Sequence, residues 1–193
     1  ARVPHSRGQR PGRKDGGKPG TVTVAGLGSG QPDGITPEAL KAVRESGAVA
    51  GYTTYLDYIR TLLAGKRVIE SGMRGEIERC TKALAAAVRG ENVCVVTSGD
   101  PGVLAMAGLI YELRFTTKAF ASVPVRVVPG VTAASLAAAA VGAPLQNGYA
   151  LVSLSDLLVP ADEVRQNLLA AVRSRLPVTL YNPAGRKRRA LLG

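Results

Sequence analysis

One stretch constrains the fold more than any other: residues 92–108, which read NVCVVTSGDPGVLAMAG. Residues 93–96 are a short apolar run rich in β-branched side chains, typical of a strand buried on both faces of a parallel sheet. The turn-forming residues 97–102 follow, and a helical pattern covers 103–117. Because ligands of open α/β sheets lie beyond the carboxyl ends of the strands, we expect this loop to border a small-molecule site.

The same order of strand, loop and helix recurs along the chain. Apolar runs predict further strands, and periodic apolar positions predict the helices between them. The expected strands are 21–27, 48–50, 66–70, 123–128, 149–154 and 177–181, and the expected helices are 37–46, 56–63, 75–89, 133–141 and 161–173. Such alternation is typical of an α/β fold, in which helices cover a parallel sheet.

The composition suits this kind of core. With 193 residues, 46% of them hydrophobic, the chain can form one large or two small domains. No apolar run is long enough to span a membrane, and the basic N-terminus lacks the apolar stretch of a secretory signal, so we expect a cytoplasmic protein. Cys80 and Cys94 have neither metal-ligand spacing nor a disulfide pattern, so we expect buried thiols and no metal site.

The single histidine, His5, lies in residues 1–20, which are rich in Gly, Pro and Arg. This stretch has almost nothing apolar to bury, so we expect a disordered extension. A folded body without histidine cannot contain a His-based triad, a His-ligated zinc or an imidazole general base.

The formal charge of +11 is concentrated at the two ends of the chain. Residues 1–20 contribute +5 and residues 186–189 (RKRR) contribute +4, which leaves +2 for everything between. Solvated ends explain this distribution, and we expect no nucleic-acid partner. Binding of RNA through the basic ends stays open as the alternative from a different functional class.

The linker 142–148 (GAPLQNG) predicts a domain boundary. We expect an N-terminal domain at 21–143 and the start of a second α/β domain at 144–193. Two strands with one and a half helices are too few to bury a core alone, so the second domain is predicted to be incomplete.

The first strand runs into Gly-rich residues 26–30 (GLGSG). These do not form a dinucleotide fingerprint, because Gln31 and Asp33 stand where the last glycine of GxGxxG should fall. The loop is either a ligand contact or a plain turn. Thr36 is the expected N-cap of the helix that starts at Pro37.

Residues 75–89 form an amphipathic pattern. We expect one apolar side and one solvent-facing side. The apolar side contains Ile77, Cys80, Leu84, Ala87 and Val88, and the solvent-facing side contains Glu76, Arg79, Lys82 and Arg89. Arg74 and Arg79 either meet an acidic substrate or belong to a solvated face.

Small residues at 129–133 (PGVTA) end a later strand and predict a second wall of the site.

Three loops now stand in a specific order: GxGxG at 26–30, SGDPG at 98–102 and PGVTA at 129–133. In this order they resemble the tetrapyrrole methylases, the class III S-adenosylmethionine-dependent methyltransferases, over residues 21–193. The segments at 51–56, 71–80, 98–113, 153–160 and 181–183 are similar to the precorrin-3B or cobalt-factor III C17-methyltransferases of cobalamin synthesis. The resemblance implies a two-domain α/β fold and a homodimer.

The resemblance also implies site residues, carried over position by position. Contacts to S-adenosylmethionine are implied for Ser98, Gly99, Asp100, Val103, Thr132, Ala133 and Asn182. The substrate side is implied for Gly28, Ser29 and Gly30, with Arg74 added for an acidic group. The family usually has Pro where Ser29 stands. Tyr52 and Met73 replace an Asp and a Lys of the uroporphyrinogen methylases, which argues against that subgroup.

The implied reaction transfers a methyl group to C17 of precorrin-3B or cobalt-factor III with ring contraction. Contraction requires a proton to leave a hydroxyl of the macrocycle, and Asp100, Asp156 and Tyr52 are the unranked candidates to accept it. A C11 methylase of the same pathway is the nearest alternative. Family members continue past Gly193 by several tens of residues, so we expect a fragment or a reduced second domain.

Overall fold

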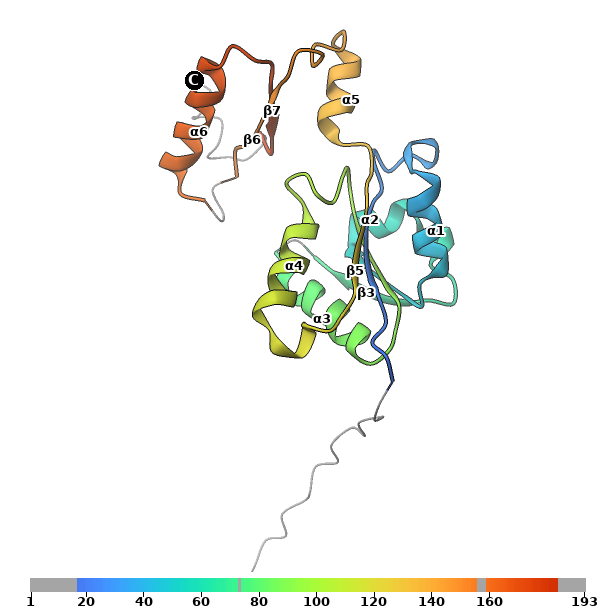
Figure 1. Ribbon diagram of the computed structural model, residues 1–193. Helices are drawn as coiled ribbons and strands as arrows, with labels where there is room; N and C mark the ends of the chain where they lie inside the picture. The colour runs from blue at the N-terminus through green and yellow to red at the C-terminus, as the bar shows by residue number, and fades with distance from the viewer. Residues whose placement is uncertain (1–16, 73, 156–158, 184–193) are drawn as a thin grey trace, which may run out of the picture.

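Five parallel strands form the main sheet in a computed structural model that describes residues 17–72, 74–155 and 159–183 (Figure 1). The order across the sheet is β3-β2-β4-β1-β5. The strands are β1 Val22–Gly26, β2 Ala48–Tyr52, β3 Arg67–Ser71, β4 Val93–Thr97 and β5 Val125–Val128. All pairings are parallel, so the carboxyl ends of the strands lie along one edge.

Helices cover both faces of this sheet (Figure 1). They are α1 Pro37–Glu45, α2 Thr53–Tyr58, α3 Glu76–Val88 and α4 Met106–Thr116, with short 3₁₀ turns η1 Pro32–Gly34, η2 Arg60–Leu62 and η3 Lys118–Phe120. A further helix, α5 Ala133–Ala140, follows β5 and lies beyond the carboxyl ends of the strands (Figure 1). One buried cluster joins α3 and α4 to the sheet, and another joins α1 and α2 to the opposite face. The side chain of Thr36 accepts the backbone N–H of Ala39 at 3.2 Å, which confirms the expected N-cap of α1.

The central strand β4 has apolar side chains on both faces. Val93 and Val95 belong to the cluster under α3 and α4, and Cys94 and Val96 belong to the cluster under α1 and α2. A strand with alternate residues buried on opposite faces needs an apolar residue at every position. The prediction of a fully buried strand here is confirmed.

A second, smaller sheet follows α5. It contains β6 Ala150–Ser153 and β7 Val178–Tyr181, which pair in parallel, and α6 Ala161–Arg173 packs on it. Its buried cluster contains Val152, Leu154, Val164 and Ala171. The α/β fold class is confirmed, and the boundary at 143/144 remains a prediction.

Two helix predictions need correction. The helix expected at 56–63 instead starts at Thr53 and ends at Tyr58, because Ile59 leaves helical geometry (φ −122°, ψ 21°). The helix expected from residue 103 begins at Met106, because Leu104 adopts a left-handed φ of +51° and Ala105 is extended. The loop after β4 is therefore longer than predicted.

The predicted orientation of α3 is wrong in part. Arg79, expected to face solvent, is 4% exposed, whereas Ile77 and Val88, expected on the apolar side, are 63% and 42% exposed. The buried face is built from small residues as well as large ones, because alanines let a helix lie close to a sheet. Its members besides Arg79 are Cys80, Ala83, Leu84, Ala86 and Ala87.

The predicted extension at 1–20 is wrong for its last residues. Gly20 is buried and donates its N–H to the carbonyl of Ala87 at 2.8 Å, so the chain is already packed there. Several predictions fall outside the described residues: His5, Met73, Asp156 and the basic run 186–189. Of the helices in the described part of the chain, none is long and apolar enough to cross a membrane.

Candidate functional site

The loops that follow β1, β4 and β5 meet backbone to backbone at three glycines. A Cβ on Gly26 would lie 2.4 Å from the carbonyl oxygen of Gly99, and a Cβ on Gly130 would lie 2.2 Å from the same oxygen. Real Cβ atoms do not approach so closely, so only glycine fits at Gly26 and Gly130. The contact brings together the three loops predicted to border the site.

The first Gly-rich loop is fixed to the loop after β4 by a pair of hydrogen bonds. Gly99 N donates to Gly28 O at 2.8 Å, and Gly28 N donates to Gly99 O at 3.2 Å. Both glycines have positive φ, +57° at Gly28 and +60° at Gly99. Gly30 has φ +82°, and a Cβ there would lie 2.4 Å from the ring of Tyr58. Ser29 between them is exposed.

Asp100 joins the loop after β4 to the loop after β5. One carboxylate oxygen accepts Gly102 N at 2.7 Å, which forms a local turn, and the other accepts Gly130 N at 3.1 Å. Both oxygens therefore accept backbone N–H groups. These contacts hold two loops at a fixed separation.

The loops after β4 and β5 also lie side by side at Gly99. A Cβ placed on Gly99 would make ordinary van der Waals contact with Ala133 N at 3.7 Å and Thr132 Cα at 3.9 Å. The predicted cofactor residues Ser98 and Val103 lie half-buried in the same loop as Gly99.

The second sheet reaches the loop after β5 through Tyr181, the last residue of β7. Its hydroxyl lies 2.6 Å from Thr132 Oγ1 and accepts Ala134 N at 3.2 Å. Tyr181 therefore caps the start of α5, where the helix has no side-chain cap of its own. The next residue, Asn182, adopts φ +57° and donates from Nδ2 to Ser153 Oγ at 3.3 Å.

Aromatic rings extend the site along the carboxyl ends of β2 and β3. Tyr52, Tyr55 and Tyr58 form a row with centroid separations of 5.3 and 6.3 Å. Arg74 follows β3, is exposed and has φ +70°. Aromatic rings and an exposed cation at the same edge of the sheet suit a large anionic ring system.

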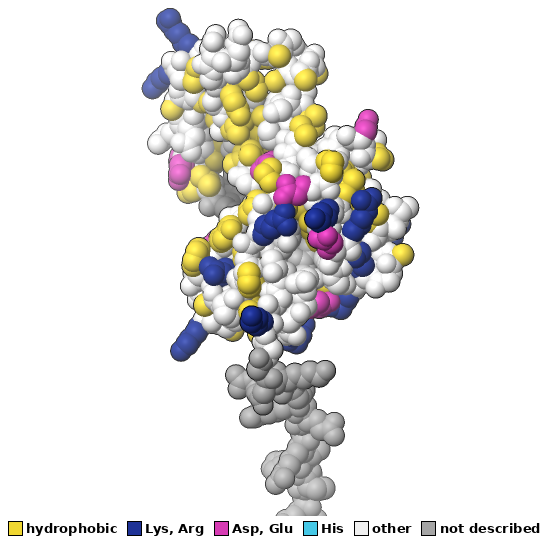
Figure 2. Space-filling view, turned by 45° about the vertical axis from the view of Figure 1, so that its right-hand side comes forward, with side chains coloured by type: hydrophobic (Ala, Val, Ile, Leu, Met, Phe, Trp, Pro, Cys, Tyr) yellow, Lys and Arg dark blue, Asp and Glu magenta, His cyan; other side chains and the backbone are white. Residues whose placement is uncertain are grey.

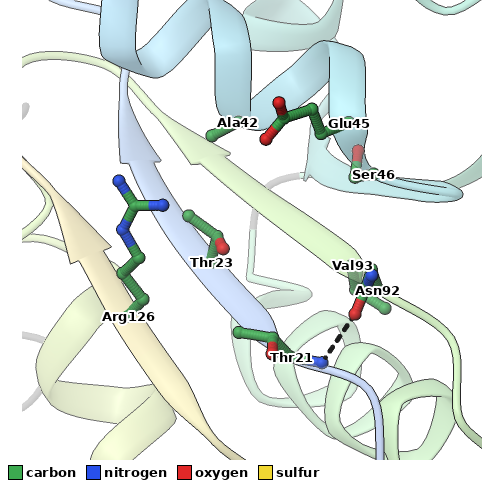
Figure 3. A pocket seen from close by; sticks show the side chains of 8 residues that line it. All are labelled: Thr21, Thr23, Ala42, Glu45, Ser46, Asn92, Val93 and Arg126. Carbon is green, nitrogen blue, oxygen red and sulfur yellow. Dashed lines mark hydrogen bonds between the residues drawn. The ribbon is translucent and has the colours of Figure 1, made fainter.

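A hollow of about 280 Å³ lies elsewhere, at the amino ends of the strands (Figure 3). Its lining includes Thr21, Asn92 and Arg126, and Thr21 N donates to Asn92 Oδ1 at 3.0 Å. Since Thr21 and Asn92 come directly before β1 and β4, this hollow is at the opposite edge from the strand-end loops. It has no part in the site described above.

Thiol and metal chemistry find no support in the described residues. Burial raises the pKa of Cys80 and of Cys94 to about 12, so both stay protonated near neutral pH. Within residues 17–72, 74–155 and 159–183, no three His, Cys, Asp or Glu side chains come together as a metal site.

The structure brings the predicted cofactor and substrate loops to one place: the loop of Gly28, predicted on the substrate side, is in contact with the loops of Gly99, Asp100 and Thr132, predicted to contact the cofactor. The sequence interpretation missed Tyr181 because only its neighbour Asn182 was carried over from the family motif. It also missed that Gly130 is a direct partner of Asp100, since the two are 30 residues apart.

The strand-end loops of the parallel sheet meet at one edge, and a second α/β unit is bonded to one of them. This arrangement defines a two-unit α/β protein of the kind that binds ligands at the carboxyl ends of its strands. Residues 21–192 match the family described as Tetrapyrrole (Corrin/Porphyrin) Methylases. The chain belongs to that family, and the predicted resemblance is confirmed.

The chain is similar to relatives that are named as C(17)-methyltransferases. The chain is 40% identical over 167 residues to a probable cobalt-factor III C(17)-methyltransferase of Salmonella typhimurium, covering 86% of this chain and 68% of the relative. It is also 40% identical to a protein of the same name from Methanothermobacter thermautotrophicus, covering 87% of this chain and 46% of the relative. The chain therefore spans about half to two thirds of the length of these relatives.

Solved structures of methyltransferases also match the chain. The crystal structure of the methyltransferase CobJ matches with a TM-score of 0.81 at 40% identity, covering 88% of this chain and 70% of CobJ. A uroporphyrin-III C-methyltransferase from Thermus thermophilus, complexed with S-adenosylhomocysteine, matches with a TM-score of 0.66 at 26% identity, covering 90% and 77%. These names agree with the methyltransferase predicted from the loops.

Proposed function

We propose that the chain is a methyltransferase of corrin synthesis that uses S-adenosylmethionine to methylate C17 of cobalt-factor III or precorrin-3B with ring contraction. The observation that carries this proposal is the meeting of the three strand-end loops at Gly26, Gly99 and Gly130, together with 40% identity to C17-methyltransferases. The proposed cofactor residues are Ser98, Gly99, Asp100, Val103, Thr132, Ala133 and Asn182.

The bound cofactor supplies a methyl group already activated on sulfonium, which a nucleophilic ring carbon accepts. The residues of this chain then have to hold the methyl group in line with that carbon and exclude water. Positioning alone can supply roughly 7–11 kcal/mol of a reaction barrier. Rigid loops tied by Asp100 and Tyr181 suit that task, and Gly28, Ser29, Gly30 and Arg74 border the substrate side.

Ring contraction requires a group that takes a proton from the macrocycle. Of the three candidates, Asp100 has both oxygens engaged with backbone N–H groups, and Asp156 lies outside the described residues. Tyr52 is half-buried at the end of β2, beside the ring of Tyr55. We therefore assign Asp100 the task of positioning the loops and keep Tyr52 and Asp156 as candidate proton acceptors.

Two measurements test the proposal. Calorimetry should show saturable binding of S-adenosylhomocysteine to the full chain, and incubation with S-adenosylmethionine and cobalt-factor III should give the methylated, ring-contracted product. Absence of both would refute the proposal. Methylation at C11 instead of C17, read by NMR of the product, would establish the alternative regiochemistry within the same family.

The RNA alternative rests on the basic ends of the chain, of which residues 1–16 and 184–193 lie outside the described residues. Figure 2 shows a face on which Lys and Arg side chains stand among Asp and Glu side chains, without a continuous basic patch. Arg126 pairs with Glu38, and Arg67 with Glu91.

We further propose a cytoplasmic homodimer, for which the exposed Phe115 (73%) offers apolar contact area. Light scattering of the purified chain tests the dimer.

A further inference from the structure

Two exposed apolar side chains flank the first Gly-rich loop. Val131 Cβ, from the loop after β5, lies 3.7 Å from the position of a Cβ on Gly28. The ring of Tyr58, from the end of α2, lies 2.4 Å from the position of a Cβ on Gly30. Val131 is 37% exposed and Tyr58 is 42% exposed, whereas the two glycines are buried. The loop after β1 is therefore flanked at both ends by apolar side chains from other elements.

The side chain of Ser29, between the two glycines, is engaged within its own loop. Its Oγ accepts the backbone N–H of Gln31 at 3.3 Å, and a Cβ on Gly34 would lie 2.5 Å from the same oxygen. The surface at the end of β1 thus consists of Val131, Ser29 and Tyr58, and none of these residues is charged.

The packing of Tyr58 on Gly30 fixes the position of the aromatic ring. Gly30 has φ +82°, and three ring atoms of Tyr58 lie within 2.8 Å of the position that a Cβ would occupy, so only glycine fits. The ring is held against the loop and is still partly open to solvent. A fixed, exposed aromatic ring can bind a flat partner with little further loss of side-chain entropy.

This uncharged surface is continuous with both parts of the proposed site. At one end, the ring centroid of Tyr58 lies 6.3 Å from that of Tyr55, which belongs to the row of tyrosines that begins at the end of β2. At the other end, Gly28 exchanges two backbone hydrogen bonds with Gly99 of the proposed cofactor loop. A molecule on this surface therefore lies beside the loop proposed to hold the methyl donor.

The chemistry of the surface favours one class of partner. The charged residues on either side of Tyr58, Asp57 and Arg60, pair with each other. An aromatic ring and an apolar side chain without a charge of their own suit the flat, apolar face of a ring system. A tetrapyrrole macrocycle has two such faces, because its carboxylates project from its periphery.

We propose that Tyr58 and Val131 are specificity-determining residues that pack against one face of the macrocycle beside the cofactor. This inference rests on the proposed tetrapyrrole substrate. It adds two side chains that the sequence analysis did not place in the site, one from the end of α2 and one from the loop after β5.

The test measures the binding of cobalt-factor III and of S-adenosylhomocysteine to the full chain by calorimetry. Tyr58→Ala removes the ring, Tyr58→Phe keeps it, and Val131→Ser replaces an apolar side chain by a small polar one. We expect the Kd of cobalt-factor III to rise about tenfold in Tyr58→Ala and about threefold in Val131→Ser. It should change less than about twofold in Tyr58→Phe, and the Kd of S-adenosylhomocysteine should change less than about twofold in all three variants.

Two matched controls remove equally exposed side chains elsewhere. Tyr149, before β6, is 42% exposed like Tyr58, and Val88, the last residue of α3, is also 42% exposed. Tyr149→Ala and Val88→Ser should therefore leave both Kd values as in the unmodified chain.

The heat capacity change of binding separates apolar contact from a charge effect. Burial of apolar surface gives a negative heat capacity change, so binding of cobalt-factor III should show a less negative value in Tyr58→Ala than in Tyr58→Phe or the unmodified chain. The salt dependence of this Kd should stay the same in Tyr58→Ala, because no charge is removed.

Three results would overturn the inference. One is an unchanged Kd and heat capacity change for cobalt-factor III in Tyr58→Ala. Another is an equal rise of this Kd in Tyr149→Ala. The third is a parallel loss of both ligands in Tyr58→Ala and Val131→Ser, which would show a purely structural contribution. Failure of the unmodified chain to bind S-adenosylhomocysteine would instead refute the proposed function, and that result is read from a different ligand.

Discussion

The carboxylate of Asp100 accepts the backbone N–H of Gly130 at 3.1 Å, and this bond joins two loops that belong to strands β4 and β5. The two strands are not neighbours, because β1 lies between them in the sheet. The bond therefore spans the end of β1 and holds the loop after β4 beside the loop after β5. Asp100, which its motif made a candidate proton acceptor, joins these two loops.

Replacement of Asp100 by Asn should weaken cofactor binding. Asn keeps one acceptor oxygen but cannot accept both N–H groups, so one charge-assisted bond, worth about 1.5–3 kcal/mol, is lost. We expect the Kd of S-adenosylhomocysteine to rise about 10- to 100-fold by calorimetry. Asp162→Asn, an exposed aspartate on α6, is the control and should bind as the unmodified chain does. Equal affinities in both variants would show that the hydrogen bond to Gly130 does not contribute to cofactor binding.

Removal of the Tyr181 hydroxyl should loosen the second sheet from the site. Tyr181→Phe keeps the ring and loses the contacts to Thr132 Oγ1 and Ala134 N. Loss of a hydrogen bond costs about 1 kcal/mol, and a donor left unpaired costs more. We therefore expect the Kd of S-adenosylhomocysteine to rise about tenfold. The matched change Tyr149→Phe, in the exposed linker before β6, should have no effect. A wild-type Kd in Tyr181→Phe would disprove the coupling.

A methyl group on Gly130 should destabilise the fold, whereas one on Gly108 should not. The Cβ of an alanine at 130 would lie 2.2 Å from Gly99 O and 2.8 Å from Gly26 C, which are backbone atoms. The Cβ at 108, inside α4, would meet nothing within 4 Å. We expect Gly130→Ala to lose about 2 kcal/mol or more, by analogy with overpacking, and Gly108→Ala to gain up to about 1 kcal/mol. Urea unfolding of the two variants compares them directly.

The sequence predicted the strand-end loops because their signals are local. An apolar run such as that of β4, followed by Ser, Gly, Asp and Pro, contains both the strand and its stop within ten residues. The same holds for the Thr36 cap of α1. The α/β class and the family followed from the order of such segments.

The contacts that shape the site could not be predicted in this way. Thr132 and Tyr181 are 49 residues apart, and their bond depends on how the second sheet folds back over α5. The burial of Arg79 was missed for a different reason. Hydrophobic periodicity assigns an arginine to solvent, but alanines on α3 bring this helix so close to the sheet that position 79 is enclosed.

Both cysteines should make the protein sensitive to alkali. In the folded chain burial raises the pKa of Cys80 and Cys94 to about 12, above the ordinary value near 9.0. Above pH ~9 the unfolded thiols ionise while the folded ones stay protonated, so the unfolded state is favoured by up to about 1.4 kcal/mol per pH unit for each cysteine. This contribution to stability is complete below pH ~8.5 and is lost as the pH rises toward 12.

The measurement is the urea midpoint at several pH values from 7.5 to 10.5. The unmodified chain should lose stability above pH ~9 more steeply than the double variant Cys80→Ala, Cys94→Ala. The double variant is the control, because its lysines and tyrosines still titrate in this pH range. A thiol reagent such as DTNB should label neither cysteine of the folded chain at pH 8, and both after unfolding. Parallel pH profiles for the two proteins, or rapid labelling of the folded chain, would show that the thiols are not enclosed as the structure has them.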